Sequence, residues 1–206
     1  MQVDMRRRGF ILILVFSAVG IVVCRGQDAA EADRLAGLLK WRAGSVVAEV
    51  GAGDGKLSLA AAVRVEPGGK VYTTELDPKK LAHLAHLAAQ EKNVAALKAG
   101  DSETNLPRAC CDSIFMRLVY HHLTHPAAID ASLYRSLKPG GLLAVIDREP
   151  PPGSSPPKGV PENRGGHGMP QKLLVHELEA AGFQVVTVQD GWPDGKYCVV
   201  AARPSP

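Results

Sequence analysis

The sequence predicts an α/β protein: a doubly wound, mostly parallel sheet of seven strands that ends in an antiparallel strand. Two observations carry this prediction. Short runs rich in β-branched residues alternate with helical segments along most of the 206-residue chain, which is typical of a parallel sheet covered on both faces. The last two runs, residues 184–190 and 196–202, are separated by the turn GWPDG without a helix, so they must pair antiparallel.

Each expected element has a local signal. The first five strands are short apolar or β-branched runs, at residues 45–50, 68–76, 93–97, 111–119 and 142–147. The helices have helical spacing or composition, at residues 28–40, 55–65, 77–92, 125–137 and 171–183. The third helix opens with Asp77 as its N-cap and Pro78 at its first position. Residues 148–168 are rich in Pro and Gly, and a loop of this length is typically functional or mobile.

The N-terminus has the pattern of a targeting segment. Three arginines at residues 6–8 precede an uncharged, mostly apolar run at residues 9–23. The run has the length of the apolar part of a secretory signal, and it is shorter than the roughly 20 residues of a membrane-spanning helix. We therefore expect residues 1–26 to be a signal peptide or an N-terminal membrane anchor, and residues 27–206 to form one folded domain. The protein would then be exported, either periplasmic or membrane-tethered, and otherwise cytoplasmic; a buried N-terminal helix is the alternative reading of the run.

Composition narrows the functional classes. Hydrophobic residues make up 46% of the chain and charged residues 22%, which supports a packed core. Part of the net charge of +3 comes from the N-terminal arginines, and no basic stripe interleaved with aromatics is present, so nucleic acid is not an expected partner. The four cysteines have neither metal-binding nor redox spacing, and we expect them to be small buried apolar residues.

The segment EVGAGDG, between the first strand and the helix that follows it, predicts a ligand site. Ligands of open α/β sheets bind at the carboxyl ends of the strands, and glycines allow a tight turn and a close approach of the backbone. A dinucleotide fingerprint is excluded because Lys56 stands where a third glycine is required, and Leu57 after it excludes a phosphate-binding P-loop. Glu49 would bring a negative charge into the cleft, which favours a cation over a pyrophosphate.

In these motifs the chain resembles the class I S-adenosylmethionine-dependent methyltransferases of Rossmann-like fold, in the small, single-domain, type 11/25-like branch. EVGAGDG is similar to the family's first motif, whose acid and glycines hold the methionine part of the cofactor. Glu75 matches the acid that binds the ribose hydroxyls, and AGDSETNLP is similar to the third motif, with Asp101 near the adenine and Ser102 beside it. The segments CDSIFMRLVYHHL and LKPGGLLAVID are similar to the family's fourth and fifth strands.

The resemblance implies S-adenosyl-L-methionine as the cofactor and a set of residues that hold it: Glu49, Gly51, Ala52, Gly53, Gly55, Glu75, Leu76, Asp101, Ser102 and Arg117. The chemistry is consistent, because the cofactor has a cationic sulfonium and no phosphates, and a carboxylate can accept hydrogen bonds from two neighbouring ribose hydroxyls. For Arg117, a snorkelling strand-end arginine is an equally weighted alternative.

The implied activity is methyl transfer to an unidentified acceptor, a small molecule or lipid rather than a nucleic acid. The alternatives are a non-catalytic domain that binds the cofactor and, less favoured, a nicotinamide-dependent reductase. The candidates for a catalytic base or an acceptor clamp are Tyr120, His121 and His122, expected at the mouth of the cleft, with His167 in the long loop as a weaker one. No metal is expected, because adjacent histidines at a strand end point in different directions.

Overall fold

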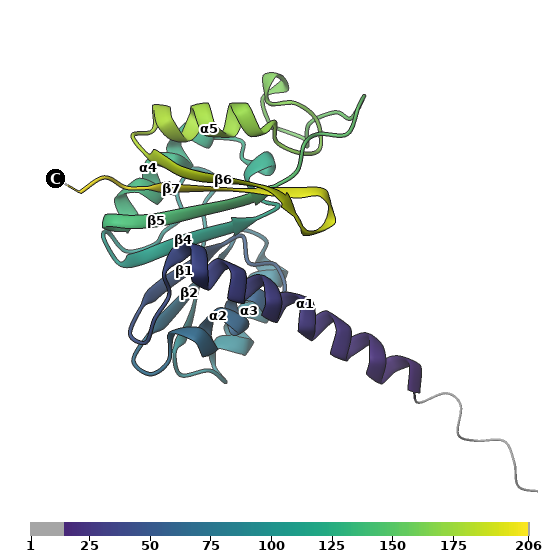
Figure 1. The fold of residues 1–206 in the computed structure, drawn as a ribbon, viewed down its shortest axis with the longest axis vertical. Helices are drawn as coiled ribbons and strands as arrows, with labels where there is room; N and C mark the ends of the chain where they lie inside the picture. Colours follow the sequence, from purple (N-terminus) through teal and green to yellow (C-terminus); the bar gives the residue numbers. More distant parts are fainter. Residues whose placement is uncertain (1–14, 206) are drawn as a thin grey trace, which may run out of the picture.

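The computed structural model describes residues 15–205, with side chains from residue 26 onward, and contains one seven-stranded sheet (Figure 1). Its strands lie in the order β3-β2-β1-β4-β5-β7-β6. Their bounds are β1 Val46–Val50, β2 Lys70–Glu75, β3 Val94–Lys98, β4 Cys111–Arg117, β5 Leu137–Asp147, β6 Gln184–Trp192 and β7 Lys196–Ala202. The first five strands pair in parallel, and β7 pairs antiparallel with both β5 and β6. The predicted fold class is confirmed.

Helices cover both faces of this sheet. Their bounds are α1 Val15–Leu39, α2 Lys56–Val65, α3 Pro78–Ala88, α4 Pro126–Ser136 and α5 Gln171–Ala180. Buried side chains of α4 and α5 pack in one core, and those of α1 and α2 pack in the other, on the opposite side of the sheet (Figure 1). Neighbouring residues of β1, such as Val47 and Ala48, belong to different cores. A strand buried on both faces reads as a continuous apolar run, which is why the β1 segment could be recognised.

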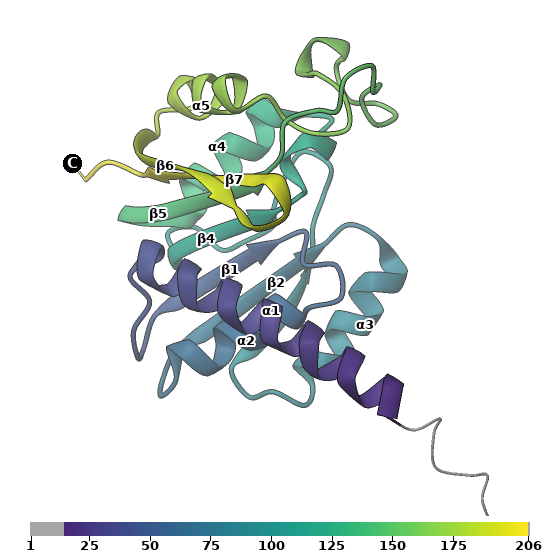
Figure 2. The same ribbon diagram turned by 45° about the vertical axis from the view of Figure 1, so that its right-hand side comes forward.

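Helix α1 runs without a break through the boundary expected at residue 26. Its last turns bury Ala32, Leu35 and Leu39 against the sheet, whereas its first turns extend beyond the body of the domain (Figure 2). Residues 1–14 and the side chains of residues 15–25 lie outside the described part of the chain. Across the residues that are described, no helix is both long and apolar enough to cross a membrane. The signal or anchor at residues 1–26 therefore stays a prediction.

Among the element boundaries that differ from the expectation are the start of β5 and the end of β4. Strand β5 begins at Leu137, five residues earlier than expected, because Leu137 pairs with Cys111 across an irregularity in the β4–β5 register. Strand β4 ends at Arg117, because Leu118 has a positive φ of 55° and turns the chain into the short 3-10 helix Tyr120–His122. Tyr120, His121 and His122 therefore lie in a 3-10 turn, and their side chains do not alternate in direction as in a strand.

The long Pro/Gly-rich loop after β5 is attached to the domain by a buried arginine. Arg164 is 2% exposed; it donates to the carbonyl oxygen of Tyr120 at 3.3 Å and forms an ion pair of 3.1 Å with Glu177 on α5. The Tyr197 hydroxyl of β7 donates to the carbonyl oxygen of Met169 near the end of the loop. The loop therefore has a defined position over the carboxyl end of the sheet.

Candidate functional site

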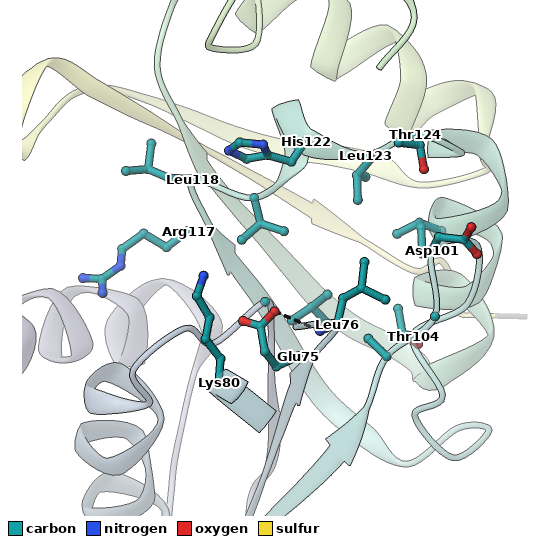
Figure 3. Close-up of a pocket in the computed structure, with 16 residues that line it drawn as sticks. Glu75, Leu76, Lys80, Asp101, Thr104, Arg117, Leu118, His122, Leu123 and Thr124 are labelled. Atoms are coloured by element: carbon teal, nitrogen blue, oxygen red, sulfur yellow. Dashed lines mark hydrogen bonds between the residues drawn. The ribbon is translucent and has the colours of Figure 1, made fainter. Parts of the chain in front are cut away.

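Two adjoining cavities lie at the carboxyl ends of the parallel strands. The chain leaves β1 for β2 on one side, while β4 pairs on the other side of β1, and this switch point is where ligands bind in open α/β sheets. A cavity of about 450 Å³ extends from Gly51 to the ends of β2 and β3 (Figure 3). A second cavity, of about 700 Å³, shares Gly51, Arg117 and Leu118 with the first and reaches α1 and the β6–β7 turn.

The three glycines of the loop after β1 have different tasks. All three have positive φ, a conformation that strains other residues. A Cβ on Gly51 would lie 2.6 Å from Val119 Cγ2, and one on Gly55 would lie 2.7 Å from Leu84 Cδ2, so both glycines are required for packing. A Cβ on Gly53 would have no described atom within 4 Å, and Gly53 lines the second cavity. Gly53 is therefore where the bare backbone faces the space that a ligand can fill.

Glu75 lies at the end of β2 with its carboxylate fixed by backbone amides. Oε1 accepts from Leu76 N at 2.8 Å (Figure 3). Oε1 also accepts from Asp77 N at 3.1 Å, and Oε2 accepts from Gly53 N at 3.0 Å. A carboxylate has roughly four acceptor positions, so the freer oxygen is Oε2. The side chain is 8% exposed and lines the first cavity, as expected of an acid that binds a vicinal diol.

Glu49 lies beneath the glycine loop and is 2% exposed. Its carboxyl accepts a hydrogen bond of 2.5 Å from the hydroxyl of Ser58 on α2. Burial raises the pKa of Glu49 from 4.5 to about 7, although the Ser58 hydrogen bond and the nearby Arg117 both lower it. Glu49 is therefore about half ionised near neutral pH, and a cation in the second cavity, which it lines, would favour the charged form.

Arg117 connects the end of β4 to the N-terminal helix. Its Nη1 donates to Asp28 Oδ1 at 3.0 Å and to Glu31 Oε2 at 2.7 Å, and the second carboxylate oxygen of Glu31 accepts from Trp192 Nε1 at 2.7 Å. The side chain of Arg34 lies over the ring of Trp192, 4.1 Å from its centroid. Arg117 thus contacts two carboxylates and lines both cavities. Residues of α1 and of the β6–β7 turn line the second cavity.

The other residues expected to contact the cofactor are distributed unevenly. Leu76 is 53% exposed and lines the first cavity together with Asp101, so an apolar surface and a carboxylate meet where the resemblance places the adenine. Ser102 does not line either cavity. Ala52 is 6% exposed, lines the second cavity, and donates its backbone N–H to the carbonyl oxygen of Thr74.

The three residues expected to be catalytic differ in burial, and only one of them lines a cavity. Tyr120 was expected at the mouth of the cleft, but its side chain is wholly buried and its hydroxyl donates to Asp130 at 2.8 Å. The turn at Leu118 causes this, since it directs Tyr120 into the core. His121 is 2% exposed and bonded to Asp147, whereas His122 is exposed and lines the first cavity.

The expectation that His121 and His122 point in different directions is wrong. Their ring centroids are 4.2 Å apart, because both residues lie in a 3-10 turn and not in a strand, where successive side chains alternate. His167, from the long loop, joins them with centroid distances of 5.1 and 5.2 Å. Sequence reasoning treated this loop histidine as a separate weak candidate, since nothing local indicates its partners.

Several cavity residues had no signal in the sequence. One of them is Lys80 on α3, which lies near Glu75 and across the cavity from the predicted residue His122 (Figure 3). Thr104 is buried at the wall of the same cavity. Asp28 and Glu31 on α1 could have been suspected only as partners for the charge of Arg117.

The sheet order and this site match those expected of a class I S-adenosylmethionine-dependent methyltransferase, a family whose cofactor is S-adenosylmethionine. Residues 48–145 match the family described as "Methyltransferase domain". The ubiquinone/menaquinone biosynthesis C-methyltransferase UbiE of Chromobacterium violaceum is 29% identical over 107 residues, which are 52% of this chain and 44% of that protein. The chain thus spans less than half the length of this curated relative.

Solved structures of methyltransferases are also similar to this chain. A methyltransferase described as SAM-dependent, from Aquifex aeolicus, is 25% identical, with a TM-score of 0.69 over 83% of this chain and 88% of that one. Geranyl diphosphate C-methyltransferase from Streptomyces coelicolor, solved with Mg²⁺, geranyl diphosphate and S-adenosylhomocysteine, has the same fold at 14% identity, with a TM-score of 0.69 over 85% of this chain and 79% of that one.

We expect Gly53→Ala to weaken binding of S-adenosylmethionine at least about tenfold, which is about 1.4 kcal/mol, because its methyl group would enter the open space at the glycine loop. Gly44→Ala is the matched control, since Gly44 also has positive φ and free space around it, at the opposite end of β1. Both variants should lose similar stability in thermal melts, and calorimetry should show weaker binding for Gly53→Ala alone. Parent-like affinity of Gly53→Ala would contradict the placement of the cofactor.

Proposed function

We propose that this chain transfers a methyl group from S-adenosylmethionine to a small-molecule or lipid acceptor. The observation that carries the proposal is a pair of buried acids beside one glycine loop: Glu49 in β1 just before the loop, where a cation is favoured, and Glu75 at the end of β2, where a diol can be accepted. When bound, S-adenosylmethionine supplies an electrophilic methyl group on a positively charged sulfur. The glycine loop lacks the spacing that a pyrophosphate would require.

Each end of the cofactor has candidate residues. Glu75 accepts a ribose hydroxyl through Oε2, and Leu76 and Asp101 flank the adenine. Glu49 and Arg117 are placed for the ammonium and carboxylate of the methionine part, whose charges they complement. Gly53 lets this part approach the backbone. These roles follow from where the side chains lie around the two cavities.

For the transfer itself, the chain needs mainly to position the acceptor. Displacement at an activated methyl carbon gains most from proximity and orientation, and a base is needed only when the acceptor carries a proton. Val119, Leu123 and Ile129 form an apolar wall of the first cavity and would exclude water from the reacting atoms. His122 at the same cavity is the residue that we propose as the clamp for the acceptor.

The apolar wall favours an acceptor with a hydrophobic part. Two of the proteins that this chain is similar to are described as acting on such compounds, one in ubiquinone and menaquinone biosynthesis and one on geranyl diphosphate. A quinol or a prenyl-bearing small molecule is therefore the acceptor class to test first.

Incubation with methyl-labelled S-adenosylmethionine and a panel of quinols and prenyl compounds tests the proposed function. Label should appear in an organic-extractable product, with formation of S-adenosylhomocysteine, and Gly53→Ala should lower the rate while Gly44→Ala should not. Tight cofactor binding without turnover on any acceptor or cell extract would instead favour a non-catalytic cofactor-binding domain.

Cofactor binding should release protons near neutral pH. In the free protein the pKa of Glu49 is raised to about 7, so about half of the molecules hold this proton at pH 7, and the cationic cofactor lowers that pKa. Affinity should therefore rise as pH increases toward 7 and level off above it. Calorimetry in two buffers of different ionisation enthalpy should show a net release of protons near pH 7. Glu49→Gln should remove this buffer dependence; a parent without it would contradict the role of Glu49.

We also propose that the protein is exported, on the basis of the three arginines and the uncharged apolar run at residues 9–23. Since the cofactor is made in the cytoplasm, an exported enzyme requires a supply of it. Fractionation of expressing cells, with N-terminal sequencing of the purified protein, tests the export. Recovery of all the protein in the cytoplasm with an intact N-terminus would contradict it.

A further inference from the structure

We propose that His121, His122 and His167 form a binding site for a divalent transition metal of the Zn²⁺ type. Each imidazole offers one ring nitrogen, and these three atoms lie within 4.8 Å of one another. The three residues come from two distant parts of the chain, the 3-10 turn after β4 and the loop after β5. Neither segment shows a metal-binding spacing by itself.

The buried member, His121, is already oriented as a metal ligand. Its Nδ1 lies 2.9 Å from Asp147 Oδ1, and the same carboxylate accepts the backbone N–H groups of His121 and Arg148, at 3.2 and 2.9 Å. A carboxylate only accepts hydrogen bonds, so Nδ1 carries a proton, and in the neutral imidazole that binds metals Nε2 then presents its lone pair. Carboxylate partners of this kind fix the tautomer and orientation of histidines that bind metals.

The free nitrogen of His121 is the observation that points to a ligand. Nε2 is buried and has no hydrogen-bond partner among the described residues. Buried polar atoms without partners are rare in native proteins, because desolvation is then uncompensated. A metal ion bound to Nε2 would satisfy this atom.

His167 is brought to the same place by a tightly packed part of the loop. A Cβ on Gly166 would clash with Ser154, and one on Gly168 would lie 2.7 Å from the carbonyl oxygen of Arg148, so both neighbours of His167 are required to be glycine. The backbone N–H of His167 donates to Ser154 Oγ at 3.1 Å. The loop therefore directs one exposed imidazole toward His121 and His122.

The donor set indicates the kind of metal. Neutral imidazoles suit Zn²⁺, Cu²⁺, Ni²⁺ and Fe²⁺, whereas Mg²⁺ and Ca²⁺ prefer oxygen ligands. Three protein ligands leave a fourth position of a tetrahedral Zn²⁺ open, as in catalytic zinc sites. With Zn–N distances of about 2.0–2.1 Å the nitrogens must approach one another more closely, and the exposed rings of His122 and His167 can rotate to do so.

The position of the site suggests its use. His122 lines the first cavity, so a metal here would lie at the cavity's rim with its open position available to an oxygen atom. If the proposed function holds, that atom is a hydroxyl of the methyl acceptor. The existence of the metal site does not depend on this, and metal binding can be measured without turnover.

The site can be tested with tag-free, full-length protein from which metals have been removed with a chelator. Zn²⁺ is titrated into this protein by calorimetry, and Co²⁺ is titrated by visible absorption. One Zn²⁺ per chain should bind and raise the melting temperature, and Co²⁺ should give the intense bands of tetrahedral coordination. His122→Ala and His167→Ala should each weaken Zn²⁺ binding by at least about tenfold, because each removes a ligand from an exposed position. His83→Ala is the control, since His83 is an exposed histidine on α3 outside the cluster.

Two results would overturn the proposal. One is a parent protein that binds Zn²⁺ no better than His122→Ala and His167→Ala do. The other is a His83→Ala variant that loses binding to the same degree, which would indicate unspecific capture by surface histidines. Failure of methyl transfer together with intact, histidine-dependent Zn²⁺ binding would reject the proposed function and leave the metal site in place.

Discussion

The pairing of β1 between β2 and β4 is the constraint on which the rest of the structure depends. Because both pairings are parallel, the carboxyl ends of β1, β2 and β4 meet at one edge of the sheet. The chain must then turn sharply after β1, and Gly51 and Gly55 allow it by leaving room for Val119 and Leu84. Both cavities are lined by the segments that follow β1 and β4 at this edge of the sheet.

A half-buried cluster of charged side chains links this edge to the N-terminal helix. Arg117 at the end of β4 bonds to Asp28 and Glu31 on α1, and Glu31 also accepts from Trp192 at the β6–β7 turn. Three elements distant in sequence are thereby held by one carboxylate–arginine cluster. Glu49 lies close enough for Arg117 to lower its pKa, so the docking of α1 and the charge state of the glycine-loop acid depend on the same arginine.

The far side of the cavity is organised by a different acid. Asp147 ends β5 and is wholly buried, and it fixes His121 and the start of the long loop through three hydrogen bonds. Arg164 holds the same loop against Tyr120 and Glu177. As a result the loop, which is long enough to be mobile, presents His167 at a defined place beside the turn after β4.

The sequence by itself determined the alternation of strands and helices, the antiparallel end of the sheet, and the glycine loop with Glu49 and Glu75, because these depend on local periodicity and on short motifs. It did not determine the place of Tyr120 or the meeting of three histidines. Both depend on the positive φ of Leu118 and on contacts between segments about 45 residues apart, for which a single sequence carries no local signal. The raised pKa of Glu49 was equally hidden, since burial and not residue type causes it.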